Sequence, residues 1–360
     1  MRDPERGRIY DLVALGLASY ARARFRVRTL GARFALDPHG LVVSSHRSDD
    51  DVPVVVSAFY RPAHGRWRRN GRLHFAVRDD LFIPGFFGGY PPGLPLWARR
   101  TLFPIGIGGI MQERLPCHPI RSPQRLRLVE LLRDHPEVPV TDLLPPELLR
   151  PFQERGLPPD ATARDAVRGR FADLVWQVVG NGELSGPQAE ESWQRRAAGT
   201  TADFRGLCEV VRSGHTLLLF PEGRPSPDGG LGPVQPGLAA LVRRARPATL
   251  RPVALAYDPL TSGRPYAYVG IGEPVEPPAD DDAVLALLRR TTPLTAGQLV
   301  AAGAADGAGA EIAAALAEGR PVAPELLDPE RRRRRLEEAR AAAGRVPLDR
   351  LVREYRSARA

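Results

Sequence analysis

Apolar positions along the chain follow two periods, and their alternation predicts an α/β protein. Short apolar runs bounded by Gly, Pro or Asp predict strands at 25–30, 34–36, 40–45, 73–78, 216–220 and 250–257. Apolar residues three or four positions apart predict helices at 7–24, 50–60, 201–212 and 236–246. Because strands and helices alternate, we expect an α/β core.

Two long stretches depart from this alternation and suggest how the chain is divided. Residues 122–200 are polar, broken by proline and helically periodic, so they predict a helical insertion. From residue 279 onward alanine, arginine and glutamate dominate, which predicts a helical extension. We therefore expect an N-terminal segment 1–35 with a basic helix and the first strand, a core domain 36–278 with the insertion at about 122–200, and a C-terminal extension 279–360.

Two apolar segments each allow two interpretations. The helix predicted at 7–24 carries arginines near its ends, so it can either pack on the domain or lie in a membrane interface. Segment 81–97 is unusually apolar for a loop; it predicts either irregular core structure or a surface that contacts an acyl chain or a membrane. No stretch approaches the roughly 20 apolar residues of a spanning helix, and the charged start does not resemble a signal peptide. We expect a cytoplasmic protein that associates peripherally with the inner face of the cell membrane.

Charge and cysteine content narrow the classes of partner. The 360 residues carry a formal charge of +9, and all basic residues are arginine, which favours anionic partners such as phosphates. The run Arg331 to Arg335 continues into a glutamate-rich helix, so it predicts a solvated helix face and no nucleic-acid partner. Cys117 and Cys208 are too few for a disulfide framework, and no metal-ligand spacing is present. Neither a metal nor an organic cofactor is expected.

A histidine and a carboxylate follow the strand predicted at 40–45. His46 ends that strand, and Asp51 lies five residues later in the first turn of the next helix. An imidazole suits proton removal near neutral pH, and a carboxylate on its second nitrogen fixes the tautomer that has a free acceptor nitrogen. Ser48 is a conceivable nucleophile, but no nucleophile-elbow motif surrounds it. The spacing therefore predicts a general base at His46, oriented by Asp51.

Together with three further segments, this pair resembles the glycerolipid acyltransferase family, which includes the lysophosphatidic acid acyltransferases. The resemblance covers residues 41–275. The first block is His46 to Asp51, with Ser45 where the family usually has Asn; the third is Phe220-Pro221-Glu222-Gly223-Arg224-Pro225-Ser226, whose arginine is shifted by one place. The second block fits Cys117 to Arg121, with Arg114 as a competing arginine, and the fourth fits Arg251-Pro252-Val253.

The resemblance implies an α/β fold like that of glycerol-3-phosphate acyltransferases, with a mixed β-sheet flanked by helices, and it implies an O-acyltransferase. The expected reaction moves a fatty acyl group from acyl-CoA or acyl-carrier protein, as co-substrate, to a lysophospholipid acceptor, with 1-acyl-sn-glycerol-3-phosphate as first choice. Glycerol-3-phosphate or another lipid or sugar hydroxyl is the alternative acceptor. A non-catalytic lipid-binding protein and, more weakly, a hydrolase are the alternatives of another class. His46 and Asp51 would be catalytic, and the residues implied in substrate binding are Arg121, Glu222, Gly223, Arg224, Ser226 and Pro252. The expected partners are the acyl donor, the acceptor and an anionic membrane surface.

Overall fold

The structure is a computed structural model that divides into two compact units, one of residues 1–75 and 208–360 and one of residues 76–207. It describes residues 6–32, 36–59, 62–63, 66–67, 73–86, 95–104, 106, 108, 111, 115–226, 228–278 and 280–359. The second unit contains the whole stretch predicted as an insertion, together with residues 76–121. The stretch predicted as a C-terminal extension belongs to the first unit.

The sheet is mixed and has seven strands in the order β1-β11-β10-β2-β9-β5-β6. Strand β2 lies between β10 and β9 and is parallel to both; β9 is parallel to β5, β1 is parallel to β11, and β10 and β11 are antiparallel. Their bounds are β1 Arg26–Gly31, β2 Gly40–Ser44, β5 Leu73–Arg78, β6 Cys117–Ile120, β9 Thr216–Leu219, β10 Thr249–Asp258 and β11 Tyr266–Ile271. All residues of β2, β9 and β11 are buried, as expected for strands covered on both faces.

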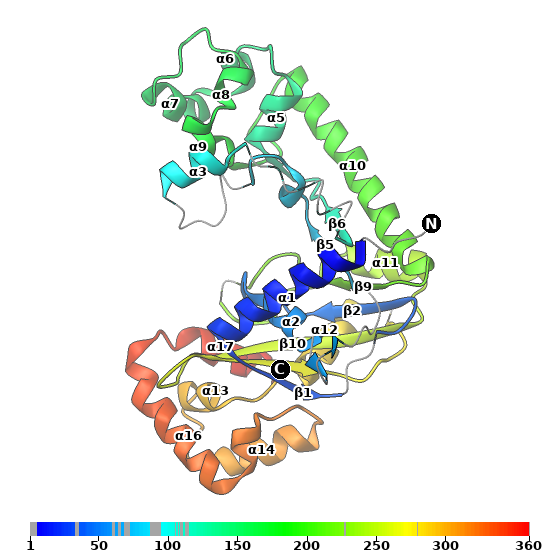
Figure 1. Ribbon diagram of the computed structural model, residues 1–360, viewed down its shortest axis with the longest axis vertical. Helices are drawn as coiled ribbons and strands as arrows, with labels where there is room; N and C mark the ends of the chain where they lie inside the picture. Colours follow the sequence, from blue (N-terminus) through cyan, green and yellow to red (C-terminus); the bar gives the residue numbers. More distant parts are fainter. Residues whose placement is uncertain are drawn as a thin grey trace. The chain divides into compact units, whose positions relative to one another are not determined.

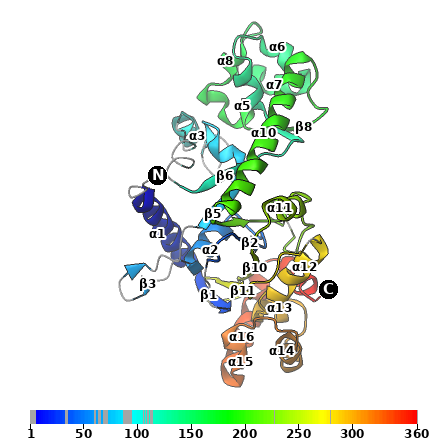
Figure 2. The ribbon, with the colours of Figure 1, turned by 90° about the vertical axis from the view of Figure 1, so that its right-hand side faces the viewer.

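Helices cover both faces of the sheet in the first unit. Figure 2 shows α1 (Arg6–Arg24) and α2 (Asp51–Phe59) on one side, with α11 (Gly237–Ala245) and α12 (Asp281–Thr291) on the other. Helix α1 packs along α2 and buries Tyr10, Ala14, Ala18 and Ala21. Packing on the domain is therefore one fate of this helix, although its outer face leaves Leu12, Leu15 and Tyr20 exposed. Among the described residues, no helix is both long enough and apolar enough to cross a bilayer.

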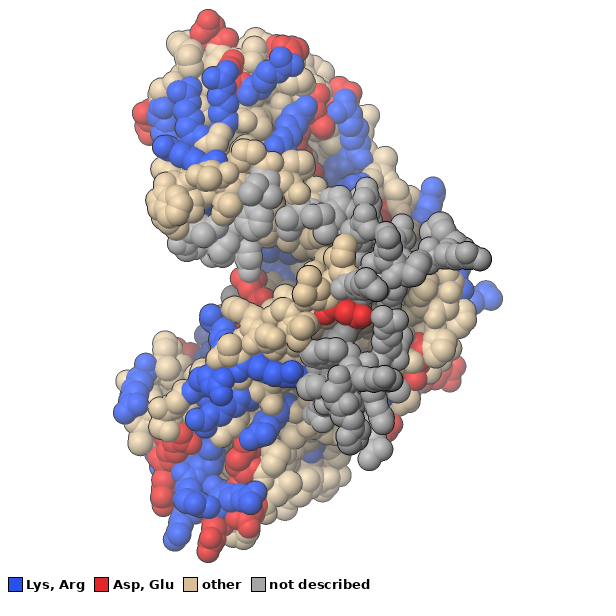
Figure 3. Space-filling model, in the orientation of Figure 1, with Lys and Arg blue, Asp and Glu red and all other residues tan. Residues whose placement is uncertain are grey.

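The C-terminal helices form a second apolar core beyond one end of the sheet. They are α13 (Ala296–Ala301), α14 (Ala308–Ala317), α15 (Pro324–Leu327), α16 (Pro329–Ala342) and α17 (Asp349–Ser357), and Figure 1 shows α13, α14 and α16 grouped there. Their buried residues pack with Tyr266 and Tyr268 of β11. Figure 3 shows basic and acidic side chains intermixed over α14 and α16, as expected for a solvated surface.

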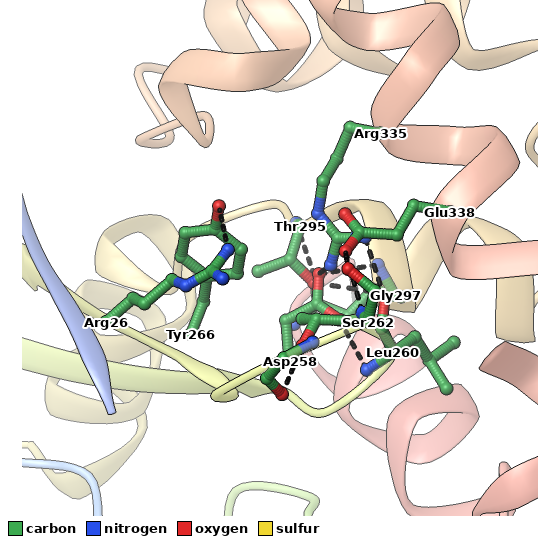
Figure 4. A network of polar contacts seen from close by, with 12 residues as sticks. Arg26, Asp258, Leu260, Ser262, Tyr266, Thr295, Gly297, Arg335 and Glu338 are labelled. Atoms are coloured by element: carbon green, nitrogen blue, oxygen red, sulfur yellow. Dashed lines mark hydrogen bonds and ion pairs between the residues drawn. The ribbon is translucent and has the colours of Figure 1, made fainter. Parts of the chain in front are cut away.

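One arginine of the predicted solvated run is buried instead. Arg335 is 5% exposed and pairs with Asp258 at 2.8 Å, where β10 ends. Figure 4 shows Arg335 reaching from α16 to this carboxylate, which also accepts the backbone N–H groups of Leu260 and Gly297. A charge buried this deeply needs such partners, and the pair ties the C-terminal helices to the sheet. The interpretation of Arg331 to Arg335 as one solvated face is thus wrong at Arg335.

The second unit has a core of its own. Its elements are α3 Leu96–Leu102, α5 Leu128–Asp134, α6 Val140–Leu143, α7 Pro146–Glu154, α8 Ala163–Ala166, α9 Ala172–Val175 and the hairpin β7 Arg125–Arg127 with β8 Val178–Gly180. Helix α10 (Pro187–Arg212) runs from this unit into the first one.

A further two-stranded ribbon, β3 Pro62–Ala63 with β4 Arg66–Trp67, belongs to the first unit.

Most predicted elements of the first unit are found within a residue or two. Helix α10 is longer than predicted, since it begins at Pro187 instead of Thr201. The strand predicted at 34–36 falls mostly on residues 33–35, outside the described residues, and Leu36 lies in no strand. Segment 81–97 begins in a 3₁₀ helix that spans Asp79–Phe82, and bends and turns follow as far as residue 86. Residues 87–94 lie outside the described residues.

Candidate active site

The candidate site lies where β2 and β9 end side by side, next to β10, which continues past them to Asp258. Because these three neighbouring strands are parallel, the segments that follow them leave the same edge of the sheet. His46 follows β2 on the turn that leads into α2, and Phe220 follows β9 on a Pro-Glu-Gly turn. The sheet order thus brings the predicted first and third blocks together.

His46 and Asp51 are joined as the sequence predicts. The imidazole Nδ1 lies 2.8 Å from Asp51 Oδ2, and the carboxylate, which can only accept, requires a proton on Nδ1. In a neutral ring this leaves Nε2 as an acceptor. Nε2 makes no hydrogen bond with any described residue, and the His46 side chain is 14% exposed to solvent. The geometry is that of a base with its acceptor nitrogen free.

Asp51 is fully buried and accepts from several donors besides the imidazole. The backbone N–H groups of Arg47 and Ser48 donate to Oδ2, the latter at 2.9 Å, and the Tyr257 hydroxyl donates to Oδ1 at 2.7 Å. Burial, and then the charge of Asp51, holds the pKa of Tyr257 well above its usual range, so the phenol remains a donor. This many donors stabilise an ionised carboxylate without solvent.

The imidazole ring is held by stacking as well as by its hydrogen bond. The ring of Phe220 lies against it with centroids 4.3 Å apart and planes 26° apart. Together the stack and the Asp51 contact restrict both rotation and tilt of the ring. Ser48 does not compete as a nucleophile, because its hydroxyl lies 3.4 Å from Asp51 Oδ1 and accepts the backbone N–H of Asp50.

The loop after β9 holds the backbone of His46 on both sides. Glu222 Oε1 accepts the His46 N–H at 2.8 Å, and the Ser226 N–H donates to the His46 carbonyl at 2.8 Å. The other carboxylate oxygen of Glu222 accepts the Gly232 N–H at 2.6 Å. Burial raises the pKa of Glu222, while these two backbone donors oppose the rise. The Glu222 carboxylate, which the resemblance implies in substrate binding, is thus engaged by two backbone N–H groups, and it holds the backbone of the histidine.

Gly223 and Arg224 form the exposed tip of the same turn. Gly223 has φ +70° and donates its N–H to the Phe220 carbonyl at 3.0 Å, so a side chain there would strain the turn. Arg224 is exposed and makes no hydrogen bond or ion pair with the described residues. It is the site arginine whose guanidinium is free to bind an anion.

Pro252 and Ser45 lie inside the sheet. Pro252 is buried on β10 opposite Val43 of β2, and its carbonyl accepts the Gly272 N–H at 2.9 Å. The Ser45 hydroxyl takes the place of a backbone carbonyl of a neighbouring strand, because it accepts the Leu255 N–H at 2.9 Å. Both residues contribute to the pairing of β10 with the end of β2 and the residue after it.

Arg121 belongs to the other unit and is described there by itself. It follows β6, and its backbone N–H donates to Asp203 Oδ2 at 3.1 Å while its guanidinium lies 3.6 Å from Oδ1. The flexible end of its side chain lies against Gly199 of α10, and a Cβ atom at that position would require this side chain to shift. The competing Arg114 lies outside the described residues. The role proposed for the second block thus remains a prediction.

The net charge of the chain is carried by the unit that contains His46. Residues 76–207 hold 16 arginines against 16 acidic residues, so the formal charge of +9 belongs to the other unit. Across the described part of the chain, no three His, Cys, Asp or Glu side chains are grouped as metal ligands would be. The electrostatics favour an anionic partner near the His46 unit.

Tyr257 and Gly232 were missed in the sequence. Tyr257 is the penultimate residue of β10, which is parallel to β2, so its place near the end of a strand beside β2 was the available signal for it. Nothing local marks Gly232, which meets Glu222 only through the folding of the loop. Comparisons of this chain with protein-family models, with curated proteins and with solved structures find no match.

We predict that Asp51 determines the tautomer of His46 and that Tyr257 only assists. In ¹⁵N-histidine NMR spectra, the wild-type imidazole should carry its proton on Nδ1, and Asp51→Asn should populate the other tautomer because an amide can donate to the ring. Tyr257→Phe should keep the wild-type tautomer, because Asp51 retains its other donors. The His46 signal is assigned from a His46→Ala spectrum. A wild-type protein with the proton on Nε2 would contradict this geometry.

Proposed function

We propose that this protein is an O-acyltransferase that uses His46 as general base. The observation that carries the proposal is the hydrogen-bonded pair of part-buried His46 and buried Asp51, in which Nε2 makes no hydrogen bond with a described residue, beyond the ends of the parallel strands β2 and β9. The resemblance of the first and third blocks to glycerolipid acyltransferases supports the same chemistry. A glycerol-3-phosphate acyltransferase-like fold is part of the proposal, and the mixed sheet flanked by helices agrees with it.

In the proposed reaction the acceptor supplies the nucleophile. Nε2 takes the proton of an acceptor hydroxyl while that oxygen bonds to the thioester carbonyl carbon of acyl-CoA or acyl-carrier protein. Collapse of the tetrahedral intermediate breaks the C–S bond, and the imidazolium returns the proton to the leaving thiolate. Asp51 stabilises the imidazolium in between. No protein nucleophile is needed, which agrees with the engaged hydroxyls of Ser45 and Ser48.

The acceptor in this proposal is a glycerophosphate, with 1-acyl-sn-glycerol-3-phosphate first and glycerol-3-phosphate as the alternative. Arg224 is exposed on the turn that holds His46, and a guanidinium can bind a phosphate through two hydrogen bonds. The positive charge of this unit favours phosphorylated donors and acceptors alike. A protein that only binds lipid would not need a histidine whose tautomer is fixed by a carboxylate, as it is in the His46–Asp51 pair.

The proposed partner surface is an anionic membrane on the cytoplasmic side. Helix α1 exposes Leu12 at 68% and Leu15 at 37%, and its carboxyl end carries Arg22 and Arg24. In the other unit α3 exposes Trp97 at 72% beside Arg99 and Arg100. Helices that carry both exposed apolar side chains and arginines are suited to a lipid interface.

We expect His46→Ala to lose acyl transfer by about 10²–10⁴-fold, the typical worth of a general base. The assay follows labelled acyl groups from acyl-CoA and acyl-carrier protein to a panel of glycerophosphates and other alcohols. His215→Ala, an exposed histidine outside the site, is the control and should keep full activity. A folded His46→Ala protein with near-normal turnover would refute the mechanism, and a wild-type protein inactive with every donor and acceptor would refute the reaction.

Arg224→Ala should raise the acceptor KM about ten- to a hundredfold and the donor KM little, because a lost bidentate phosphate contact costs about 1.5–3 kcal/mol. Arg224→Lys should rescue only part of this, since an ammonium cannot form the paired contact. Arg243→Ala, an exposed arginine of α11, is the matched control. An unchanged acceptor KM in Arg224→Ala would favour an acceptor without a phosphate, or a phosphate bound elsewhere.

Binding to anionic vesicles should be peripheral and weaken with salt, because each basic residue near an anionic surface contributes on the order of 1 kcal/mol that ions screen. Leu12→Asp with Leu15→Asp should lower co-sedimentation at any salt concentration. Neutral vesicles are the control. Wild-type protein that never sediments with anionic vesicles, or that resists extraction by high salt and carbonate, would contradict peripheral binding.

A further inference from the structure

Helix α17 contacts both loops of the candidate site, although it lies about 300 residues from His46 in sequence. The proposed reaction uses none of its residues. Leu351 and Tyr355 of α17 are buried in the C-terminal core, and these apolar residues dock the helix. The polar contacts of α17 with the loops are additional to this packing.

The first contact reaches the residue that follows His46. Arg350 of α17 donates a guanidinium hydrogen bond to the backbone carbonyl of Arg47. Arg47 donates its own backbone N–H to Asp51 and its guanidinium to the Gly229 carbonyl. The Arg47 side chain is 2% exposed, so it points into the protein and cannot serve as a phosphate ligand at the surface. Arg350 therefore holds the turn between the base and the carboxylate that orients it.

The second contact reaches the loop that holds the His46 backbone. Gly229 has φ +84°, and a Cβ atom on it would lie 2.5 Å from Arg350 Cγ and 2.8 Å from the Arg350 carbonyl oxygen. Arg353 pairs with Asp228 at 3.1 Å, and the Ser357 hydroxyl accepts the Leu231 N–H at 3.3 Å. Helix and loop are thus packed backbone to backbone next to Gly232, whose N–H binds Glu222.

Helix α17 also carries a buried carboxyl group, on Glu354. Glu354 of α17 is 3% exposed, and burial raises its pKa to about 7, while Arg47, Arg350 and Gln298 oppose the rise and Asp258 adds to it. Arg47 is the charge that opposes it most. Glu354 thus places a buried carboxyl group on α17 one turn from Arg350, and the charges of Arg47 and Arg350 favour its ionised form.

We infer that α17 is a positioning element of the site and that Arg350 is its main positioning residue, acting on His46 and Asp51 through the backbone of Arg47. This inference rests on the proposed function, which makes the placement of Nε2 important for rate. Displacing a catalytic group by about 1 Å can cost about 10²-fold in rate, even when the change lies outside the chemistry.

The test compares Arg350→Ala, Arg350→Lys and the control Arg356→Ala, an exposed arginine on the same helix. Arg350→Ala should lower kcat about tenfold or more with both KM values unchanged, and Arg350→Lys should recover part of the loss by donating to the same carbonyl. Arg356→Ala should match wild type. Gly229→Ala tests the contact from the loop side and should likewise lower kcat.

Amide hydrogen exchange gives a readout that does not depend on turnover. Arg350→Ala should speed exchange at 47–51 and 229–232 and leave the buried strands β2 and β9 protected, with an unchanged melting temperature. Exchange at these loops equal to wild type, or an unchanged kcat in Arg350→Ala, would overturn the inference. A raised KM with normal kcat would also overturn it, because Arg350 would then be a substrate ligand. If the wild type transfers no acyl group, the proposed function fails while the exchange result still decides the positioning role.

Discussion

The site depends on the way one residue's backbone is held. Both the N–H and the carbonyl of His46 are bonded to the loop after β9, through the Glu222 carboxylate and the Ser226 N–H. Since β2 and β9 are parallel neighbours, this link joins two strand ends across the edge of the sheet. A surface histidine after a strand would otherwise be mobile. Here its backbone is as constrained as that of a residue within a strand.

The remaining contacts extend this constraint from the backbone to the ring and to the next turn. Phe220, from the same loop, stacks on the imidazole, and Asp51 binds Nδ1 from the first turn of α2. Tyr257 reaches Asp51 from the third parallel strand, and α17 contacts the carbonyl of Arg47. Each element fixes a different degree of freedom of His46, and Nε2 alone is left to act.

The sequence allowed the site to be predicted where its chemistry is local. The strand, turn and helix around His46 and Asp51 follow from hydrophobic periodicity and spacing, and the contact between the two side chains follows from those elements. The α/β core was predicted from the alternation of strands and helices, whereas β6 and β11 were not predicted. β6 has four residues including Pro119 and carries little periodic signal, but β11 is an apolar run of six residues between Pro265 and Gly272, and this signal was overlooked.

What could not be predicted depends on long-range packing. A Pro-Glu-Gly turn indicates a glutamate near the site, but its partners, the N–H groups of His46 and Gly232, are defined only by the folded loop. Arg335 belongs to a run of arginines, yet its side chain is buried because it pairs with Asp258 at the end of β10. The contact of Arg350 with Arg47 spans most of the chain. In each case a charged residue is used for structure, which composition alone does not reveal.

The most direct measurement is the turnover of Glu222→Gln together with exchange of the His46 amide. An amide side chain keeps one acceptor oxygen and cannot bind the N–H groups of both His46 and Gly232. The account predicts that kcat falls about tenfold or more and that the His46 amide exchanges faster, while Glu276→Gln, an exposed control, changes neither. Wild-type kcat and wild-type exchange in a folded Glu222→Gln protein would contradict the claim that this loop positions the base.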